Sequence, residues 1–459
     1  MYGVSTGVLK LCRFYGVDPD ELTRPTIGCV MVEQFIDHLE ARNVRAMGPT
    51  RMPLFTVHAH KIREYQWVSV KNALRKSGFV VAPCGSGKTL IGLMVAVLNG
   101  GRFLIVTTRY AEQWRMTLAN FFSPIGQVDV VLYSDIDAID IHNMPHVVIA
   151  TYAGFNARTK TTKTRLVRQM MFTTMILDEA HNAASPQNLK MVQGVHSRHS
   201  ILLTATMIRE DAELCKLQHE FGGIVCSVNR AELVRDGHIA DVKCINIIVP
   251  YDDTLEAMVG KTTALAIHPN KMQVLHSALS RLCSAQHKVL IFCDDLFCLR
   301  WTSLIMTKLG KVPIVGFISM QTPYVERAAK IAQFETQRTA CALFLSRTGD
   351  EALDIPSATA AVVFWNHWGS RRQIVQRIGR IARHSTSKAP ALFLTLISQD
   401  EKELERSSHR EMYVAEHGFT IETVHQDKSE FGTRLRARHD KYCATLAKVY
   451  GRHRPKRIL

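Results

Sequence analysis

The sequence predicts an α/β protein with two parallel β-sheets in tandem. Three observations predict it. Short apolar, β-branched runs alternate with helix-length segments from about residue 54 to 240. The same alternation restarts after a bridge at 241–270 and continues to about 430. The runs are also continuously apolar, which is typical of parallel strands that are covered by helices on both faces.

The expected strands follow from these runs. In the first block they are 79–83, 103–108, 128–133, 147–152, 174–180 and 201–206. In the second block they are 288–294, 314–319, 341–347, 358–365 and 391–398. We therefore expect domains at 54–240 and 271–430 with a bridge at 241–270 between them. We also expect a short N-terminal extension at 1–53, with one helix at 32–44, and a basic C-terminal tail at 431–459.

Charge points to a polyanionic partner. The 459 residues hold 57 Lys and Arg against 41 Asp and Glu, a net charge of +16 and a pI of about 9.4. Half of that excess lies in the tail, which carries nine basic residues and one acidic residue. The tail is interpreted as a phosphate-tracking arm, a nuclear address or a solvated end without a role.

Cysteine usage and hydropathy place the chain inside a cell. The 11 Cys are scattered without a C-x-x-C pair, which predicts reduced thiols rather than disulfides or a metal cluster. No apolar run approaches the roughly 18 residues of a membrane span, and no signal peptide is evident. We expect no membrane association, and localisation in the nucleus for a eukaryotic or nuclear-replicating viral protein, otherwise in the cytoplasm.

A phosphate-binding loop is the most informative stretch. An apolar run, a glycine-bearing turn and a helix-length apolar segment follow one another at 79–98, the order of strand, loop and helix. The loop consists of Ala82, Pro83, Cys84, Gly85, Ser86, Gly87, Lys88 and Thr89. Glycines let successive N–H groups converge on a phosphate at the positive end of the helix. Lys88 is expected to reach the β- and γ-phosphates of ATP, and the Thr89 hydroxyl to hold Mg²⁺.

An acidic pair follows another buried strand of the same block. Asp178 and Glu179, within a D-E-A-H sequence that ends at His181, are expected at the carboxyl edge of the sheet, where ligands bind. Asp178 would hold the metal and Glu179 would orient and deprotonate the attacking water. Thr204 and Thr206 close a further strand and are interpreted as sensors of the γ-phosphate or as ordinary strand-end residues.

A basic helix is predicted in the second block. Gln376 begins the sequence Q-R-I-G-R-I-A-R, in which Arg380 and Arg383 are three residues apart and so share a helix face. The two arginines are interpreted either as part of a solvated basic face or as groups that stabilise transition-state charge.

These motifs, in this order, resemble those of superfamily 2 helicases, and more narrowly the XPB family of DNA translocases. The resemblance covers about residues 54–425 and includes Ala82 in place of the usual glycine. Its segments are 62–66, 112–114, 203–211, 268–271, 346–356, 369–383 and 398–405. The Arg209-Glu210-Asp211 triplet and the lead-in at 369–373 are its family-specific parts.

The resemblance implies two RecA-like domains and further residue roles. Gln66 would read the adenine, and Gln376, Arg380 and Arg383 would close the ATP site from the second domain. Arg209, Glu210 and Asp211 would assist strand separation, and His181, Thr204, Thr206 and Gly349 would couple the ATP site to nucleic acid. Two departures stand out. The N-terminal region is reduced to about 53 residues, and the bridge at 251–268 carries Lys261 as its one basic residue.

The predicted function is ATP- and Mg²⁺-dependent movement on, or unwinding of, duplex DNA, with transcription or repair proteins as further partners. Two alternatives stay open at this point. One is an RNA-directed ATPase of the same superfamily, and the other is a non-catalytic scaffold that holds nucleic acid.

Overall fold

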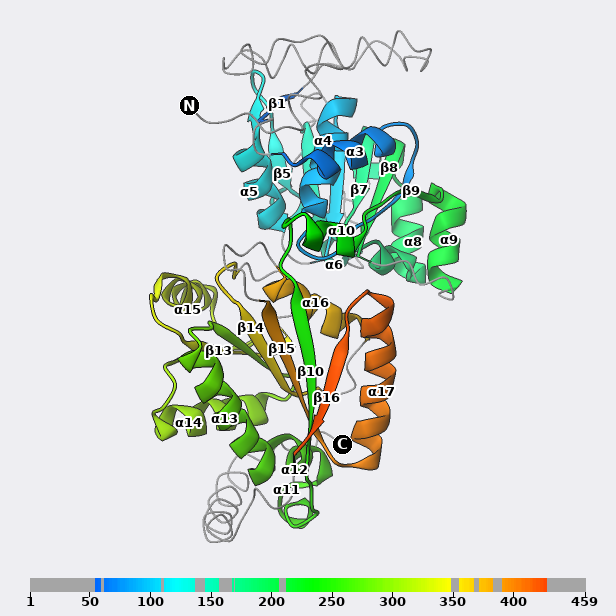
Figure 1. The fold of residues 1–459 in the computed structure, drawn as a ribbon. Helices are drawn as coiled ribbons and strands as arrows, with labels where there is room; N and C mark the ends of the chain where they lie inside the picture. Colours follow the sequence, from blue (N-terminus) through cyan, green and yellow to red (C-terminus); the bar gives the residue numbers. More distant parts are fainter. Residues whose placement is uncertain are drawn as a thin grey trace. The chain divides into compact units, whose positions relative to one another are not determined.

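The computed structural model describes most of the chain between residues 54 and 426. The described residues are 54–58, 62–108, 111–136, 145–156, 167–168, 170–205, 212–347, 355–366, 371–382 and 390–426. They divide into two compact units at Arg230/Ala231, ten residues before the predicted limit at 240. Each unit is built on a seven-stranded sheet with helices on its two faces (Figure 1). The predicted extension at 1–53, its helix at 32–44 and the tail at 431–459 lie outside the described residues.

The sheet of the first unit is parallel throughout, with the strand order β5-β6-β3-β7-β8-β2-β9. Its strands are β2 (Gly78–Val81), β3 (Phe103–Thr107), β5 (Val130–Leu132), β6 (Val147–Thr151), β7 (Met171–Leu177), β8 (His196–Thr204) and β9 (Ile224–Ser227). A separate antiparallel pair joins β1 (Phe55–Val57) to β4 (Phe122–Pro124). All six strands predicted for the first block are present, and the structure adds β1, β4 and β9.

The helices of the first unit connect these strands. They are α3 (Glu64–Ala73), α4 (Lys88–Asn99), α5 (Ala111–Phe121), α6 (Tyr152–Phe155), α8 (Pro186–Gln193) and α9 (Ala212–Phe221), with 3₁₀ turns η3 (Tyr133–Asp135) and η4 (Ala180–Ala184). A further helix, α10 (Arg230–Arg235), begins at the division between the units. Helix α4 is buried at every position from Leu90 to Leu98, which explains its uniformly apolar sequence.

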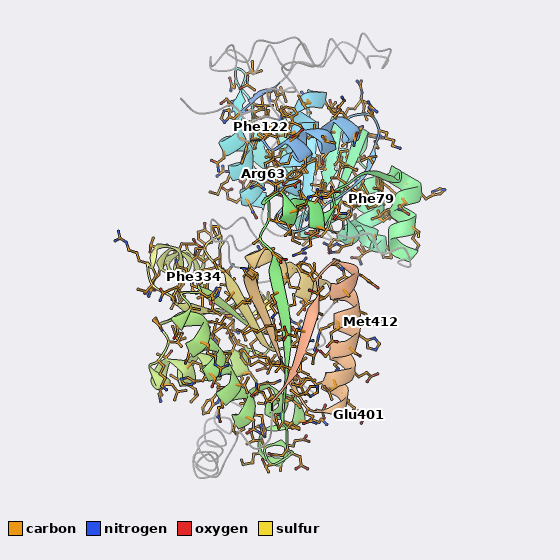
Figure 2. All side chains as sticks on the ribbon, in the orientation of Figure 1. Arg63, Phe79, Phe122, Phe334, Glu401 and Met412 are labelled. Atoms are coloured by element: carbon orange, nitrogen blue, oxygen red, sulfur yellow. The ribbon has the colours of Figure 1, made fainter. Side chains whose placement is uncertain are left out.

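The apolar core lies on both faces of the first sheet because side chains alternate along each strand. Phe79, labelled in Figure 2, packs into one cluster and its neighbour Val80 into the other. Phe103 and Leu104 on β3 divide between the two clusters in the same way. The continuously apolar runs of the sequence therefore correspond to strands that are covered on both sides, as predicted.

The sheet of the second unit is also parallel, in the order β12-β13-β11-β14-β15-β10-β16. Its strands are β10 (Val242–Val249), β11 (Val289–Cys293), β12 (Ile314–Ile318), β13 (Ala342–Leu345), β14 (Ala360–Trp365), β15 (Ala391–Ser398) and β16 (Ile421–His425). Its helices are α11 (Glu256–Val259), α12 (Lys261–Ile267), α13 (Pro269–Ser284), α14 (Leu296–Leu309), α15 (Tyr324–Thr336), α16 (Arg371–Ile381) and α17 (Glu401–Glu416). All five predicted strands of the second block are confirmed.

The prediction of a bridge at 241–270 is wrong in its first part. Residues 242–249 form β10, which lies between β15 and β16 in the second sheet. Polar side chains at Lys243 and Asn246 interrupt its apolar pattern and hide the strand in the sequence. Asn246 is nevertheless buried, because its amide Nδ2 donates to Glu411 Oε1 of α17 at 2.6 Å.

Candidate active site

The phosphate loop connects the carboxyl end of β2 to the first turn of α4. Gly85 and Gly87 both have φ of +81°, the left-handed region that favours glycine. Gly87 is the N-cap residue of α4, so the free N–H groups of the first helical turn begin here. Within the loop, the Ser86 N–H and hydroxyl both donate to Pro83 O, at 3.2 and 2.7 Å. The loop therefore has the backbone geometry of an anion site.

Two side chains of α3 donate hydrogen bonds to the phosphate loop. Tyr65 OH donates to Ser86 O at 2.6 Å, and Gln66 Nε2 donates to the same oxygen at 3.1 Å. Gln66 Oε1 accepts from the backbone N–H of Arg63, labelled in Figure 2, at 3.0 Å. Gln66 is 4% exposed. The structure thus gives Gln66 a supporting contact with the loop, and its reading of adenine stays a prediction.

Gly87→Ala is expected to destabilise the first unit by about 1–2 kcal/mol, since a Cβ is disfavoured at positive φ. A Cβ built at Gly87 would also lie 2.5 Å from Gln66 Nε2, which would force that amide away from Ser86. Urea unfolding of the full chain measures the change. Gly126→Ala is the matched control, because Gly126 has φ of +73° with no atom near its Cβ position. If both variants lost the same unfolding free energy, the contact between the new Cβ and Gln66 would contribute nothing to the loss in Gly87→Ala.

The acidic pair follows β7 at the same edge of the sheet. Asp178 N donates to Val106 O at 2.9 Å, which continues the pairing of β7 with β3 by one residue. Asp178 Oδ2 accepts from Thr107 Oγ1 at 2.9 Å and from Trp114 Nε1 at 3.2 Å, and Oδ1 accepts from Glu179 N at 3.0 Å. The carboxylate is therefore held in one orientation by three donors.

Burial is the main cause that raises the pKa of Asp178 to about 6, and the neighbouring Glu179 adds to it. The hydroxyl of Thr107, the charge of Lys88 and the indole of Trp114 act in the opposite direction. The phosphate loop and the acidic pair follow β2 and β7, which both pair with β8 in the sheet. Lys88 Nζ itself donates to Ala82 O at 3.2 Å.

The pKa of Asp178 is about 6 in the folded chain without a metal and near 4 in the unfolded chain. The protonated carboxyl therefore contributes its full stabilisation of the folded state below pH 4, and this contribution is lost as the pH rises through 6. The unfolding free energy of the wild type, relative to Asp178→Asn, should therefore fall by about 1 kcal/mol between pH 5 and pH 8. Urea titrations of both proteins at several pH values, with EDTA present, measure this difference. A difference that does not change with pH would contradict the raised pKa.

Glu179 occupies a strained backbone position directly after Asp178. Its φ and ψ of 46° and 60° lie in the left-handed region, which a non-glycine residue rarely adopts. Asn182 stabilises the turn, because its N–H and its side-chain Nδ2 donate to Glu179 O at 2.8 and 3.1 Å. His181 Nδ1 lies 3.6 Å from Glu179 Oε2. Asn182 therefore holds the backbone of Glu179 in this conformation.

Two further predicted residues, Thr204 and Thr89, adjoin or belong to the phosphate loop. Thr204 ends β8, and its carbonyl accepts from Ala82 N at 3.0 Å, so it adjoins the phosphate loop. Thr89 follows Lys88 in the first turn of α4. The residues Thr206, Arg209, Glu210, Asp211, Gly349 and Arg383 lie outside the described part of the chain. Their assigned roles stay predictions.

Three residues that no sequence motif marked also contact Asp178. They are Thr107 at the end of β3, Trp114 on α5 and Tyr152 on α6, whose hydroxyl donates to Asp178 O at 3.1 Å. Burial, with Asp178 and Glu179 nearby, raises the pKa of Tyr152. A polar residue after an apolar strand was the available signal for Thr107, whereas nothing local marks Trp114 or Tyr152.

In the second unit, the predicted basic helix is confirmed as α16. Gln376 and Arg380 are partly exposed on it, whereas Arg377 between them is fully buried. Lys261 at the start of α12, the one basic residue of the bridge at 251–268, lies with its Nζ 2.6 Å from Asp400 Oδ2. That lysine therefore binds a carboxylate of its own chain.

The described ranges contain neither a metal cluster of protein side chains nor a helix that could span a membrane. No group of three or more His, Cys, Asp or Glu side chains there could hold a metal ion by itself. No helix in the same ranges has the length and apolar character to cross a bilayer.

Both units of the chain are similar to known helicase and restriction-enzyme families. Residues 233–449 match the family described as the ERCC3/RAD25/XPB C-terminal helicase, and residues 59–209 match the type III restriction enzyme res subunit. The factor IIH helicase/translocase subunit XPB of Antonospora locustae is 31% identical over 79% of this chain and 55% of its own length. The corresponding subunit of Enterocytozoon bieneusi is 28% identical over 79% of this chain and 63% of its own length.

A solved structure shares the fold across both units. The RNA-bound form of S. cerevisiae Dbp5 superposes with a TM-score of 0.57 at 14% identity, covering 82% of this chain and 93% of that one. The two sheets and the phosphate loop thus define a protein with tandem RecA-like domains, the architecture of superfamily 2 helicases. Within that class, the chain is similar to XPB helicase/translocase subunits. It spans 63% or less of the length of the two XPB relatives named above.

Proposed function

We propose that this chain is an ATP-dependent translocase or helicase that couples ATP hydrolysis to movement along duplex DNA. The observation that supports it most is the carboxyl edge of the first sheet. There the phosphate loop at the N-terminus of α4 follows β2, and the acidic pair follows β7, the strand on the other side of β8. The similarity to XPB subunits supports DNA as the substrate, and the excess of basic residues agrees with it.

The residues of the first unit have separate roles in this proposal. The loop N–H groups bind the phosphates of ATP, and Lys88 leaves the carbonyl of Ala82 to contact them. Glu179 orients the attacking water and takes its proton. Thr107 and Trp114 hold the carboxylate of Asp178 in place, and Asn182 holds the left-handed turn at Glu179.

The donor set fits Mg²⁺. Asp178 and Thr89 would hold the ion together with phosphate oxygens and water, because magnesium sites of this kind use one or two protein ligands. When bound, Mg²⁺ neutralises charge that develops on the phosphates.

The second unit completes the site in this proposal. Gln376, Arg380 and Arg383 contact the phosphates when the two units close on ATP, so that hydrolysis drives opening and closing along the DNA. Transcription or repair proteins are the proposed partners, since the relatives carry names of factor IIH subunits. The proposed location is where the DNA lies, which is the nucleus of a eukaryotic cell.

The test is ATP hydrolysis by the full chain without nucleic acid, with duplex DNA and with single-stranded RNA. We expect stimulation by duplex DNA and little by RNA. Stronger stimulation by RNA would favour an RNA-directed ATPase. Binding of nucleic acid without any hydrolysis would favour a scaffold and overturn the proposal.

A further inference from the structure

Arg377 is the largest fully buried side chain in the described part of the chain. It lies in the middle of α16, one residue after Gln376 and three before Arg380. An arginine is almost never buried to this extent unless its charge is paired. The partners of Arg377 therefore indicate what the burial achieves.

Two partners hold the guanidinium at the carboxyl ends of two strands. Arg377 Nη2 donates to Asp294 Oδ1, and Nη1 donates to Asn366 Oδ1, both at 2.5 Å. Asp294 directly follows β11, and Asn366 directly follows β14. The planar guanidinium also lies over the ring of Phe292, with Cζ 4.9 Å from its centre. The fork of two hydrogen bonds, from Arg377 to Asp294 and Asn366, and the contact with the ring together fix the position of α16 on the sheet.

The same carboxylate contacts a third strand end. Arg347 Nε lies 3.8 Å from Asp294 Oδ2, and Arg347 comes two residues after β13. Arg347 is half exposed, whereas Asp294 and Arg377 have side-chain exposures of 0%. Asp294 thus joins α16 to the edge of the sheet where ligands bind in parallel α/β proteins.

Helix geometry relates this anchor to the exposed residues of α16. Gln376 and Arg380 are four residues apart and therefore lie on one stripe of the helix. Arg377 is adjacent to that stripe and faces the sheet. A shift or rotation of the helix at Arg377 would displace Gln376 and Arg380 together.

We propose that Arg377 is a positioning residue, which Asp294 and Asn366 hold so that α16 presents Arg380 to the phosphates of ATP. This inference rests on the proposed function. Arg377 itself touches no substrate, and its effect on hydrolysis passes through Arg380. Asp294 and Asn366, which follow two different strands, thus both accept from the guanidinium that sets the orientation of α16.

The test variant is Arg377→Lys in the full chain. Lysine keeps the charge but cannot reproduce the fork to both Asp294 and Asn366. We expect the kcat for ATP at saturating duplex DNA to fall by about 10- to 100-fold, because small misplacements of a catalytic group have effects of that size. The Kd for ATP should stay within about twofold, since the affected contact forms in the transition state.

A double variant separates positioning from general damage. In an Arg380→Ala background, Arg377→Lys should lower kcat by no more than a further two- to threefold, about the level expected when one residue acts through the other. Losses that multiply in the double variant would overturn the inference. Asn366→Ala is the milder second variant if Arg377→Lys does not fold, and it should lower kcat in the same direction.

The matched control is Lys271→Met. Lys271 on α13 forms another buried ion pair of the same unit, with its Nζ 2.9 Å from Glu403 Oε1 of α17. This variant should lower the Tm while the folded protein keeps its kcat within about threefold, because additive effects are the rule for separate sites. A folded Arg377→Lys protein with wild-type kcat, alongside a slow Arg380→Ala protein, would refute the positioning role alone. A wild type that does not hydrolyse ATP would refute the proposed function as well.

Discussion

Glu179→Gln is expected to lower kcat for ATP hydrolysis by about 10²- to 10⁴-fold, the usual contribution of a general base. The amide has nearly the shape of the carboxylate, so the left-handed turn at this residue and its contacts to Asn182 should persist. The affinity for Mg²⁺-ATP should stay within about twofold of the wild type, because phosphate contacts are not made by this side chain. Rapid-quench hydrolysis and fluorescent-nucleotide titration measure the two quantities.

The effects of Glu179→Gln are to be compared with those of Lys88→Ala. Lys88→Ala removes a phosphate contact, so nucleotide binding and turnover should both fall. If the two variants lost the same affinity for ATP, Glu179 and Lys88 would not have the separate roles assigned to them. Wild-type turnover in Glu179→Gln would equally contradict the role as general base.

Arg380→Ala and Arg383→Ala are expected to have the second large effect. Each should lower kcat by about 10³- to 10⁵-fold, the range for arginines that stabilise charge in phosphoryl transfer. The Kd for ATP should change little, because the contact forms only in the transition state. Single-turnover hydrolysis at saturating duplex DNA, together with nucleotide titration, measures both quantities.

Arg281→Ala is the control for these two variants. Arg281 is exposed on α13 of the same unit and has no role in the proposed site. It loses the same charge and the same side-chain length, and its kcat should match the wild type. If removing Arg380 and removing Arg281 had the same effect, α16 would contribute only surface charge.

Most strands of both sheets could be predicted because continuous apolar runs of this length are too short for buried helices and are typical of buried strands. The phosphate loop and the acidic pair could also be predicted, since each depends on residues that are contiguous in sequence. Strand β10 was missed because Lys243 and Asn246 interrupt its apolar pattern, and the partner that satisfies the buried Asn246, Glu411, lies 165 residues away. The exposed edge strand β16 was missed because its side chains are mostly polar or exposed.

The contacts of the site residues depend on sheet order, which local patterns do not reveal. Thr107 reaches Asp178 only because β3 and β7 are neighbours, although 71 residues separate the two side chains. Similarly, α16 carries several basic residues, and the sequence alone does not show that Arg377 is the buried one. Its partner Asp294 lies 83 residues earlier in the chain.

The most direct test of ATP-driven movement on duplex DNA is displacement of a third strand from a triplex by the full chain. The wild type should displace the third strand when ATP and Mg²⁺ are present. This displacement does not require the two strands of the underlying duplex to separate. Lys88→Ala and Glu179→Gln should bind the same DNA and leave the triplex intact. ATP hydrolysis by the wild type without displacement, or displacement that does not require ATP, would contradict the account.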